Sequence, residues 1–154
     1  METTETNLYR SVRKESFPDG VIVNDHAVSG VLYPSFEASY YEVRVAGKTV
    51  TRMRPADVSP YTHEGQKVVD PGGGTSLFDK SGVFGPKYWW YFHIPKGTVI
   101  PPPLRVRHTG YNDDYKAEHY QIEAATERMP LDAYKGALDN LARNAIEKRY
   151  KDAR

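Results

Sequence analysis

Residues 115–149 read YKAEHYQIEAATERMPLDAYKGALDNLARNAIEKR, and near Met129-Pro130 their apolar repeat changes from that of a strand to that of a helix. Residues 115–124 alternate about a period of two, whereas the apolar side chains after Pro130 recur about every 3.6 residues. The helical stripe comprises Leu131, Tyr134, Leu138, Leu141, Ala145 and Arg149, with Ile146 beside it. A strand followed by a single C-terminal helix predicts an α+β fold.

Short strands are expected over the rest of the chain, because glycine and proline interrupt it at close intervals. The segments predicted as strands are 8–13, 88–94 and 104–108, with weaker signals at 21–23 and 31–33 and a hairpin of 40–45 and 48–53 around Ala46-Gly47. The aromatic run Tyr88–Phe92 is interpreted as core. Residues 54–74 have little apolar pattern and are expected to form a long irregular connection.

On the helix predicted after Pro130, two acidic residues each stand four positions before a basic one. Asp139 precedes Arg143, and Glu147 precedes Lys151. Pairs in this order favour a helix slightly.

The composition limits the classes of function. The chain has 154 residues, a formal net charge of +1 and no cysteine. Its length fits one domain spanning residues 1–154, and the absence of cysteine excludes disulfides, thiolate catalysis and iron–sulfur clusters. The balanced charge makes nucleic acid and anionic membranes improbable partners. No signal peptide or membrane span is recognised, so a cytoplasmic protein is expected.

Common catalytic and metal-binding motifs are absent. The run Gly72–Ser76 has no lysine after its last glycine and so is not a Walker phosphate loop. None of the five histidines is paired at metal-ligand spacing, so no metal site is predicted.

The strand around His119 offers a more specific signal. Alternation places His119, Gln121 and Glu123 on one face. If Arg10 and the Thr75-Ser76 pair approach that face, one cleft contains a cation, two hydroxyls, an imidazole and a carboxylate. Such a cleft suits an anionic ligand that loses a group from a sugar carbon. The alternative is that His119 and Arg10 are structural residues, and that the hydroxyls cap a turn.

Several motifs resemble one known family. They are Leu8-Tyr9-Arg10, Gly73–Asp79, Ile94–Thr98 with Ile100-Pro101-Pro102, Tyr111-Asn112, Ala117 with His119-Tyr120 and Ile122, Leu138-Asp139-Asn140 and Arg143–Ile146. In their order and spacing the chain is similar to the type VI secretion effector toxins of the type-six-exported effector two family. The likeness covers about half of the chain, from Gly73 onward, together with its first strand.

The resemblance implies an ADP-ribosyltransferase-like split β-sandwich of short strands with a C-terminal helix, and NAD as the substrate. It implies that Arg10, Tyr9 and Gly74 bind NAD. It assigns the catalytic roles to Thr75, Ser76, His119 and Glu123, with Glu123 as the secondary candidate.

The activity implied by the resemblance is cleavage of the nicotinamide–ribose bond and transfer of ADP-ribose to an unknown macromolecule in the cytosol of a target cell. For a bacterial source it also implies an immunity protein that covers the cleft. Two alternatives stay open: a toxin or binding module that keeps the fold without catalysis, and a transferase-like enzyme that acts on nucleic-acid phosphate.

Overall fold

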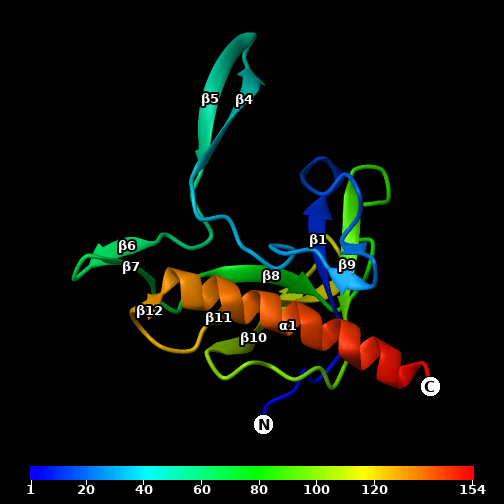
Figure 1. Ribbon diagram of the computed structural model, residues 1–154. Helices are drawn as coiled ribbons and strands as arrows, with labels where there is room; N and C mark the ends of the chain where they lie inside the picture. Colours follow the sequence, from blue (N-terminus) through cyan, green and yellow to red (C-terminus); the bar gives the residue numbers. More distant parts are fainter.

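A five-stranded antiparallel sheet and one long helix make up the body of the computed structural model, which describes residues 1–154 (Figure 1). In spatial order the sheet consists of β10 (Leu104–Asn112), β11 (Ala117–Ala124), β8 (Gly74–Phe78), β1 (Leu8–Arg13) and β9 (Trp89–Ile94). The predicted α+β class is confirmed. The strands predicted at 8–13, 88–94, 104–108 and 115–124 all lie in this sheet.

The sheet consists of two halves that share very little pairing. β1 pairs with β9 along six residues, but it pairs with β8 only at Tyr9 and Phe78. Beyond that pair the strands diverge, and β1 and β9 stand at a steep angle to β8, β11 and β10 (Figure 1). This divergence agrees with the split β-sandwich that the resemblance implies, and it leaves a space between the two halves of the sheet.

Helix α1 (Leu131–Asp152) covers one face of the sheet. Its buried side chains are Tyr134, Ala137, Leu138, Leu141, Ala142, Ala145 and Ile146. They pack in a single cluster with apolar residues of the strands, among them Leu8, Leu77 and Ile122. The predicted helix and most of its stripe are therefore confirmed, and burial of this stripe is what fixes the helix against the sheet.

The acidic and basic residues that stand four positions apart, Asp139 with Arg143 and Glu147 with Lys151, do not form ion pairs in the helix. Asp139 instead accepts hydrogen bonds from the segment that contains Ser29 and Tyr33. At the C-terminal end the pair that forms is Lys148 with Asp152, at 2.6 Å. Helical spacing favours an ion pair only weakly, and a tertiary partner outweighs it.

Smaller elements extend from the sheet. They are the 3₁₀ turn η1 (Lys14–Ser16), the hairpin of β2 (Ile22–Val23) and β3 (His26–Ala27), the hairpin of β4 (Ser39–Val45) and β5 (Lys48–Arg54), and a sheet of β6 (Tyr61–His63), β7 (Gln66–Val69) and β12 (Met129–Pro130). The predicted β4–β5 hairpin is confirmed. The irregular connection expected over residues 54–74 is wrong in part, because β6 and β7 form a hairpin there.

Two further predictions need correction. Residues 31–33 form no strand; they cross the core as a turn in which Val31 and Leu32 are fully buried. The run Tyr88–Phe92 is not all core: Phe92 is buried, but Tyr88 is 56% exposed. An apolar run therefore determines neither the burial of each of its residues nor whether the segment pairs as a strand.

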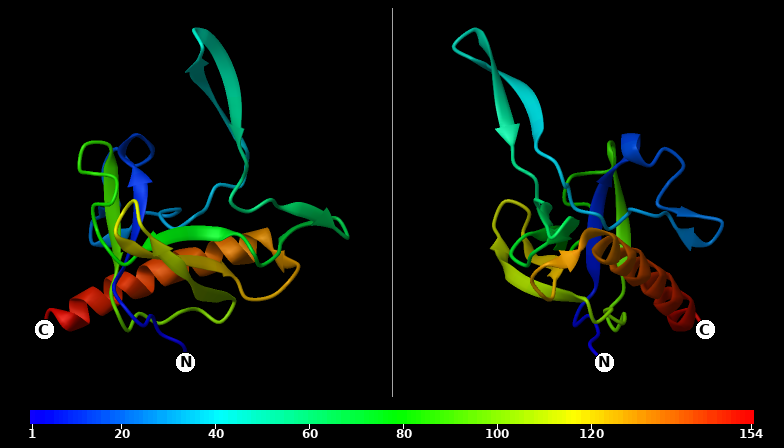
Figure 2. Two further views of the ribbon diagram at one scale, coloured as in Figure 1. Left: turned by 180° about the vertical axis from the view of Figure 1, so that it is seen from behind. Right: turned by 60° about the vertical axis from the view of Figure 1, so that its left-hand side comes forward.

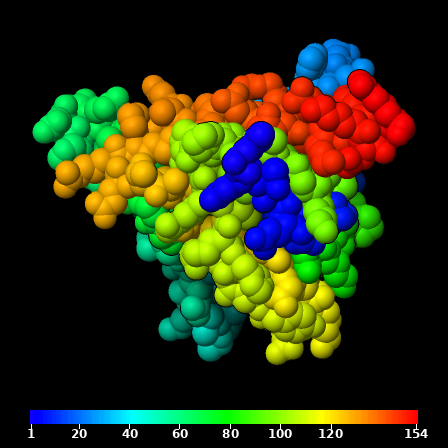
Figure 3. Space-filling model, turned by 90° about the horizontal axis from the view of Figure 1, so that it is seen from below, coloured from blue at the N-terminus to red at the C-terminus, as the bar shows by residue number.

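The N-terminal segment lies on the face seen in Figure 3, against the connection that follows β9. Thr3 forms an isolated bridge with Val99, and the buried Thr4 hydroxyl donates to the carbonyl of Pro95 at 2.7 Å. None of the helices combines the length and the apolar character that crossing a membrane requires.

Candidate functional site

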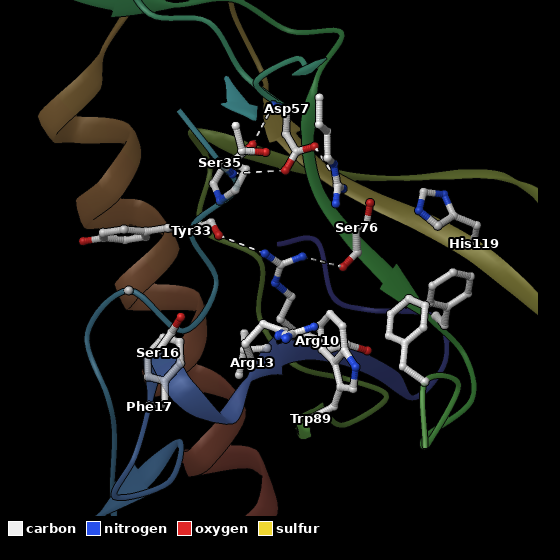
Figure 4. A pocket seen from close by; sticks show the side chains of 18 residues that line it. Arg10, Arg13, Ser16, Phe17, Tyr33, Ser35, Asp57, Ser76, Trp89 and His119 are labelled. Atoms are coloured by element: carbon white, nitrogen blue, oxygen red, sulfur yellow. Dashed lines mark hydrogen bonds and ion pairs between the residues drawn. The ribbon is translucent and has the colours of Figure 1, made fainter. Parts of the chain in front are cut away.

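A pocket of about 470 Å³ occupies the angle between the two half-sheets (Figure 4). Arg10 of β1, Ser76 of β8 and His119 of β11 all line it, so the structure brings together three of the residues that the sequence singled out. Its volume lies in the usual range for small-molecule sites, about 300–1,000 Å³.

Arg10 lies at the centre of the pocket. Its guanidinium donates to the carbonyl of Tyr33 at 3.0 Å and to the carbonyl of Ser76 at 3.3 Å. A guanidinium has five N–H donors, so three are left over. The Nε atom is buried and has no hydrogen-bond partner, and the same is true of the hydroxyl of the neighbouring Ser11, which also lines the pocket. Buried polar groups without partners are rare, and each requires an explanation, such as an ordered water, an ion or a ligand.

The charge of Arg10 is not neutralised by a direct ion pair. Burial lowers the pKa of Arg10 to about 10; Asp57 opposes this effect and Arg54 adds to it. The group stays protonated near neutral pH. Asp57 is itself held by Ser35, which donates its backbone N–H to the carboxylate at 3.1 Å. Arg10 is therefore a fixed cation in the lining of the pocket, with donor capacity that the protein does not use.

Aromatic side chains form another part of the wall. Phe84 packs against Trp89 with ring centroids 4.7 Å apart and against Phe78 at 6.2 Å. The guanidinium of Arg13 lies 5.1 Å from the centroid of the Trp89 ring. Aromatic surface beside cations suits a ligand that carries a planar ring and negative charge.

Ser76 and Thr75 point to opposite faces of β8. Ser76 faces the pocket, whereas Thr75 is fully buried and donates its hydroxyl to the carbonyl of Leu32 at 2.6 Å. Adjacent residues of a strand always diverge in this way. The structure thus brings only one of the two predicted hydroxyls to the pocket, and Thr75 holds the segment that follows Val31.

His119 lines the pocket across from Arg10 and packs edge-on against Phe78, with ring centroids 5.1 Å apart. Burial, and secondarily the charge of Arg107, lower the pKa of His119. Its Nδ1 contacts the hydroxyl of Thr109, which also lies 3.0 Å from the carbonyl oxygen of His119. When that hydroxyl donates to the carbonyl, the ring donates from Nδ1, and Nε2 is left free to accept a proton.

Glu123 does not line the pocket. Its fully buried carboxylate accepts hydrogen bonds from Arg105 Nε at 2.5 Å, from Gln121 Nε2 at 2.7 Å and from Arg107 Nε at 3.4 Å. Burial opposes ionisation, but the bonds from Gln121, Arg105 and Arg107 outweigh it and lower the pKa of Glu123. Its acceptor capacity is used within the protein.

Tyr9 and Gly74 also lie outside the pocket lining. Tyr9 stacks on His93 with ring centroids 4.9 Å apart. Gly74 is buried where β8 pairs with β11, and a Cβ at this position would overlap the carbonyl oxygen of Ile122. A glycine is therefore required at position 74 by the close approach of two backbones.

Sequence reasoning missed the segment Ser29–Pro34, from which Gly30, Tyr33 and Pro34 line the pocket. Asp139 of α1 fixes it by accepting from Ser29 Oγ at 3.0 Å, Gly30 N–H at 3.0 Å and the Tyr33 hydroxyl at 2.8 Å. Asp139 stands in the resembling motif Leu138-Asp139-Asn140, which was the one available signal. Nothing local in the sequence connects Asp139 to residues more than 100 positions away.

The chemistry available at this site is recognition of an anion and of a planar ring, next to a hydroxyl and a neutral imidazole. Nowhere in the chain are three or more His, Asp or Glu side chains grouped to hold a metal ion. The arrangement suits charge stabilisation and proton transfer.

Comparison with known proteins gives one consistent result. The model of the Tse2 ADP-ribosyltransferase toxin family matches residues 4–150. Toxin Tse2 of Pseudomonas aeruginosa is 32% identical to this chain over 163 aligned positions, which cover 99% of this chain and 96% of that protein. The likeness thus extends through residues 11–71, where the motifs alone show no correspondence.

Proposed function

The chain belongs to the Tse2 ADP-ribosyltransferase toxin family, and on this basis we propose that it cleaves NAD in the pocket between its half-sheets and transfers ADP-ribose to a macromolecule of the cell it poisons. The family supplies the class of protein. The residues that line the pocket support NAD as the substrate.

The observation that carries the proposal is the unused hydrogen-bonding capacity of Arg10. The buried Nε of Arg10 and the buried hydroxyl of Ser11 have no partner in the protein. Phosphate and ribose oxygens are suitable acceptors and donors for them. The nearby Trp89 and Phe84 offer aromatic surface for a nicotinamide or adenine ring.

The proposed reaction breaks the C–N bond between ribose and nicotinamide. The bonding electron pair leaves with nicotinamide, and positive charge develops on the ribose carbon. An acceptor then supplies an electron pair to that carbon and gives up a proton, for which Nε2 of His119 is a suitable base. In this scheme Arg10 holds a phosphate or a ribose, and Ser76 orients the nicotinamide ribose.

We propose supporting roles for the other residues that the sequence singled out. Thr75 keeps the Ser29–Pro34 wall in place, and Gly74 allows β8 to lie close to β11. Tyr9 lies at the seam between the two half-sheets, where β1 pairs with β8 only through Tyr9 and Phe78. Glu123 of β11 holds Arg105, and through it the start of β10, and it acts on the substrate only if these bonds open.

The test is release of nicotinamide from NAD by the purified protein, followed by chromatography. Arg10→Gln and Ser76→Ala should reduce the rate roughly 100-fold, the usual effect of removing one transition-state contact. Arg52→Gln and Ser81→Ala are matched controls, because both side chains are exposed and lie outside the pocket. Thermal unfolding of each variant shows whether the fold is retained.

The alternatives give different results. If the wild-type protein stops growth when expressed inside cells but neither releases nicotinamide nor lowers cellular NAD, the chain is a binding module. If the transferred label is removed by nuclease and not by protease, the acceptor is nucleic acid. For a bacterial source we also expect an immunity protein, and its binding should be lost when pocket-rim residues such as Arg13 are changed.

A further inference from the structure

The hairpin β4–β5 extends away from the rest of the molecule (Figures 1 and 2). Its two strands pair only with each other. Of residues 39–54, only Val43 is partly buried, and all others are exposed. A two-stranded hairpin is at best marginally stable alone in water, and nothing in the rest of the protein covers this one. Such an element is suited to contact another molecule.

The two faces of the hairpin differ in composition. Cross-strand register places these residues on one face: Ser39, Tyr41, Val43, Val45, Lys48, Val50, Arg52 and Arg54. At its centre Val43 lies opposite Val50, and Tyr41 and Val45 flank them. Tyr41 is 50% exposed and Val45 is 44% exposed. The charged residues on the face that contains Val43 and Val50 are all basic, whereas the opposite face carries both Glu42 and Arg44.

The apolar and basic face is continuous with the pocket. Its innermost cross-strand pair is Ser39 with Arg54, and both residues line the pocket. A molecule that lies along this face therefore reaches the mouth of the site that contains Arg10. The opposite face contributes no residue to the pocket.

We propose that this face binds the acceptor of ADP-ribose, and that the acceptor is a protein whose surface has an apolar patch bordered by Asp and Glu. The inference rests on the function proposed above. The charge of Lys48, Arg52 and Arg54 matches acidic side chains, and the central valines require an apolar counterpart. Valine neither stacks on bases nor pairs with phosphate, so the centre of the face fits a protein better than it fits a nucleic acid.

The experiment separates docking from chemistry by measuring two rates. The first is nicotinamide release with water as the acceptor, in the absence of other macromolecules. The second is transfer of labelled ADP-ribose to the proteins of a lysate from sensitive cells. The test variants are the pairs Tyr41→Thr with Val50→Thr and Lys48→Glu with Arg52→Glu, since threonine retains the preference for a strand.

Matched controls are available within the chain. Tyr40→Thr with Met53→Thr changes the opposite face of the same hairpin, and Lys67→Glu with Lys151→Glu makes the same change in charge elsewhere on the surface. The test variants should release nicotinamide at the wild-type rate but label protein roughly tenfold more slowly, because a few central residues carry most of the binding energy. The controls should label like wild type.

Three results overturn the proposal: equal labelling by the test and control variants, wild-type hydrolysis of NAD without labelled protein, and a label that resides in nucleic acid.

If the wild type releases no nicotinamide, the proposed function fails. The docking proposal is then tested by measuring growth arrest when each variant is expressed in cells. Loss of arrest in the test variants alone then still supports protein docking by this face, whereas arrest equal to that of the controls refutes it.

Discussion

The hydroxyl of Tyr33 donates to the carboxylate of Asp139 at 2.8 Å, and the carbonyl of the same Tyr33 accepts from Arg10 at 3.0 Å. One residue thus joins helix α1 to the cation of the pocket. Since Asp139 also binds Ser29 and Gly30, it controls the position of a wall that it does not itself line.

Asp139→Asn should therefore weaken NAD binding although Asp139 does not line the pocket. The amide has one acceptor oxygen where the carboxylate has two. It can no longer accept both from Gly30, which donates to Oδ1, and from Ser29 and Tyr33, which donate to Oδ2, and this loss costs about 1 kcal/mol of stability. We expect KM for NAD to rise several-fold with a smaller change in kcat, and Tyr33→Phe to show the milder form of the same effect. Steady-state kinetics of nicotinamide release measures both. A fall in kcat with KM unchanged would contradict a positioning role.

Substitution of Thr75 should lower the stability of the fold, whereas substitution of Ser76 should lower the rate of nicotinamide release. Thr75→Val leaves the buried carbonyl of Leu32 without a partner and should lower the free energy of unfolding by about 1–3 kcal/mol, while Thr75→Ser should restore most of it. Ser76→Ala should leave stability nearly unchanged and remove most of the activity. Urea denaturation and nicotinamide release on the same preparations measure the two effects. The assignment is wrong if Thr75→Val is as stable as wild type but inactive.

His119 should make the protein less stable as the pH falls. Burial and Arg107 lower its pKa in the folded state below the ordinary value of 6.5, so below that value the unfolded chain takes up a proton more readily. The free energy of unfolding then decreases with pH. His93, whose pKa burial also lowers, acts in the same direction. His119→Gln should reduce the loss of stability between about pH 7.5 and pH 5.5, and adding His93→Gln should reduce it further. Denaturation curves at the two pH values that show the same loss in wild type and both variants would refute this.

Glu123 should act on stability more than on the substrate. In the folded state its pKa is lowered by Gln121, Arg105 and Arg107, which together outweigh burial, so it stabilises the fold above its ordinary pKa of 4.5 and loses that effect as the pH falls through the folded value. Glu123→Gln should cost about 2 kcal/mol at neutral pH, because charged hydrogen bonds to a buried group are lost. Thermal unfolding and nicotinamide release check this in parallel. A variant of wild-type stability that releases no nicotinamide would instead place Glu123 on the substrate.

The elements with a strong local pattern could be predicted from the sequence. The 3.6-residue stripe from Leu131 onward located α1, and the alternation in residues 8–13 and 117–124 located β1 and β11. The turn at Glu64-Gly65, where both residues have positive φ, was a hairpin signal that the sequence reading overlooked. The apolar residues 31–33 indicated burial correctly, but a buried turn and a buried strand have the same composition.

The site was predictable in its residue types and only partly in its geometry. Arg10, Ser76 and His119 meet as expected, because the resembling motifs locate them and the alternation of strands selects their faces. That Thr75 faces the core follows from the same alternation. The contacts of Tyr33 with Arg10 and Asp139 could not be predicted, since they depend on how distant segments pack.

The lone register pair of Tyr9 with Phe78 gives the central sheet an unusual mechanical property. Arg10 belongs to one half-sheet and His119 to the other, so any ligand that contacts both spans the seam and crosslinks the halves. Its binding free energy then adds to the core packing of Leu8, Leu77 and Ile122 that already holds the two halves together. The toxin should be stiffest when occupied, and amide hydrogens near the seam should exchange with solvent fastest when it is empty.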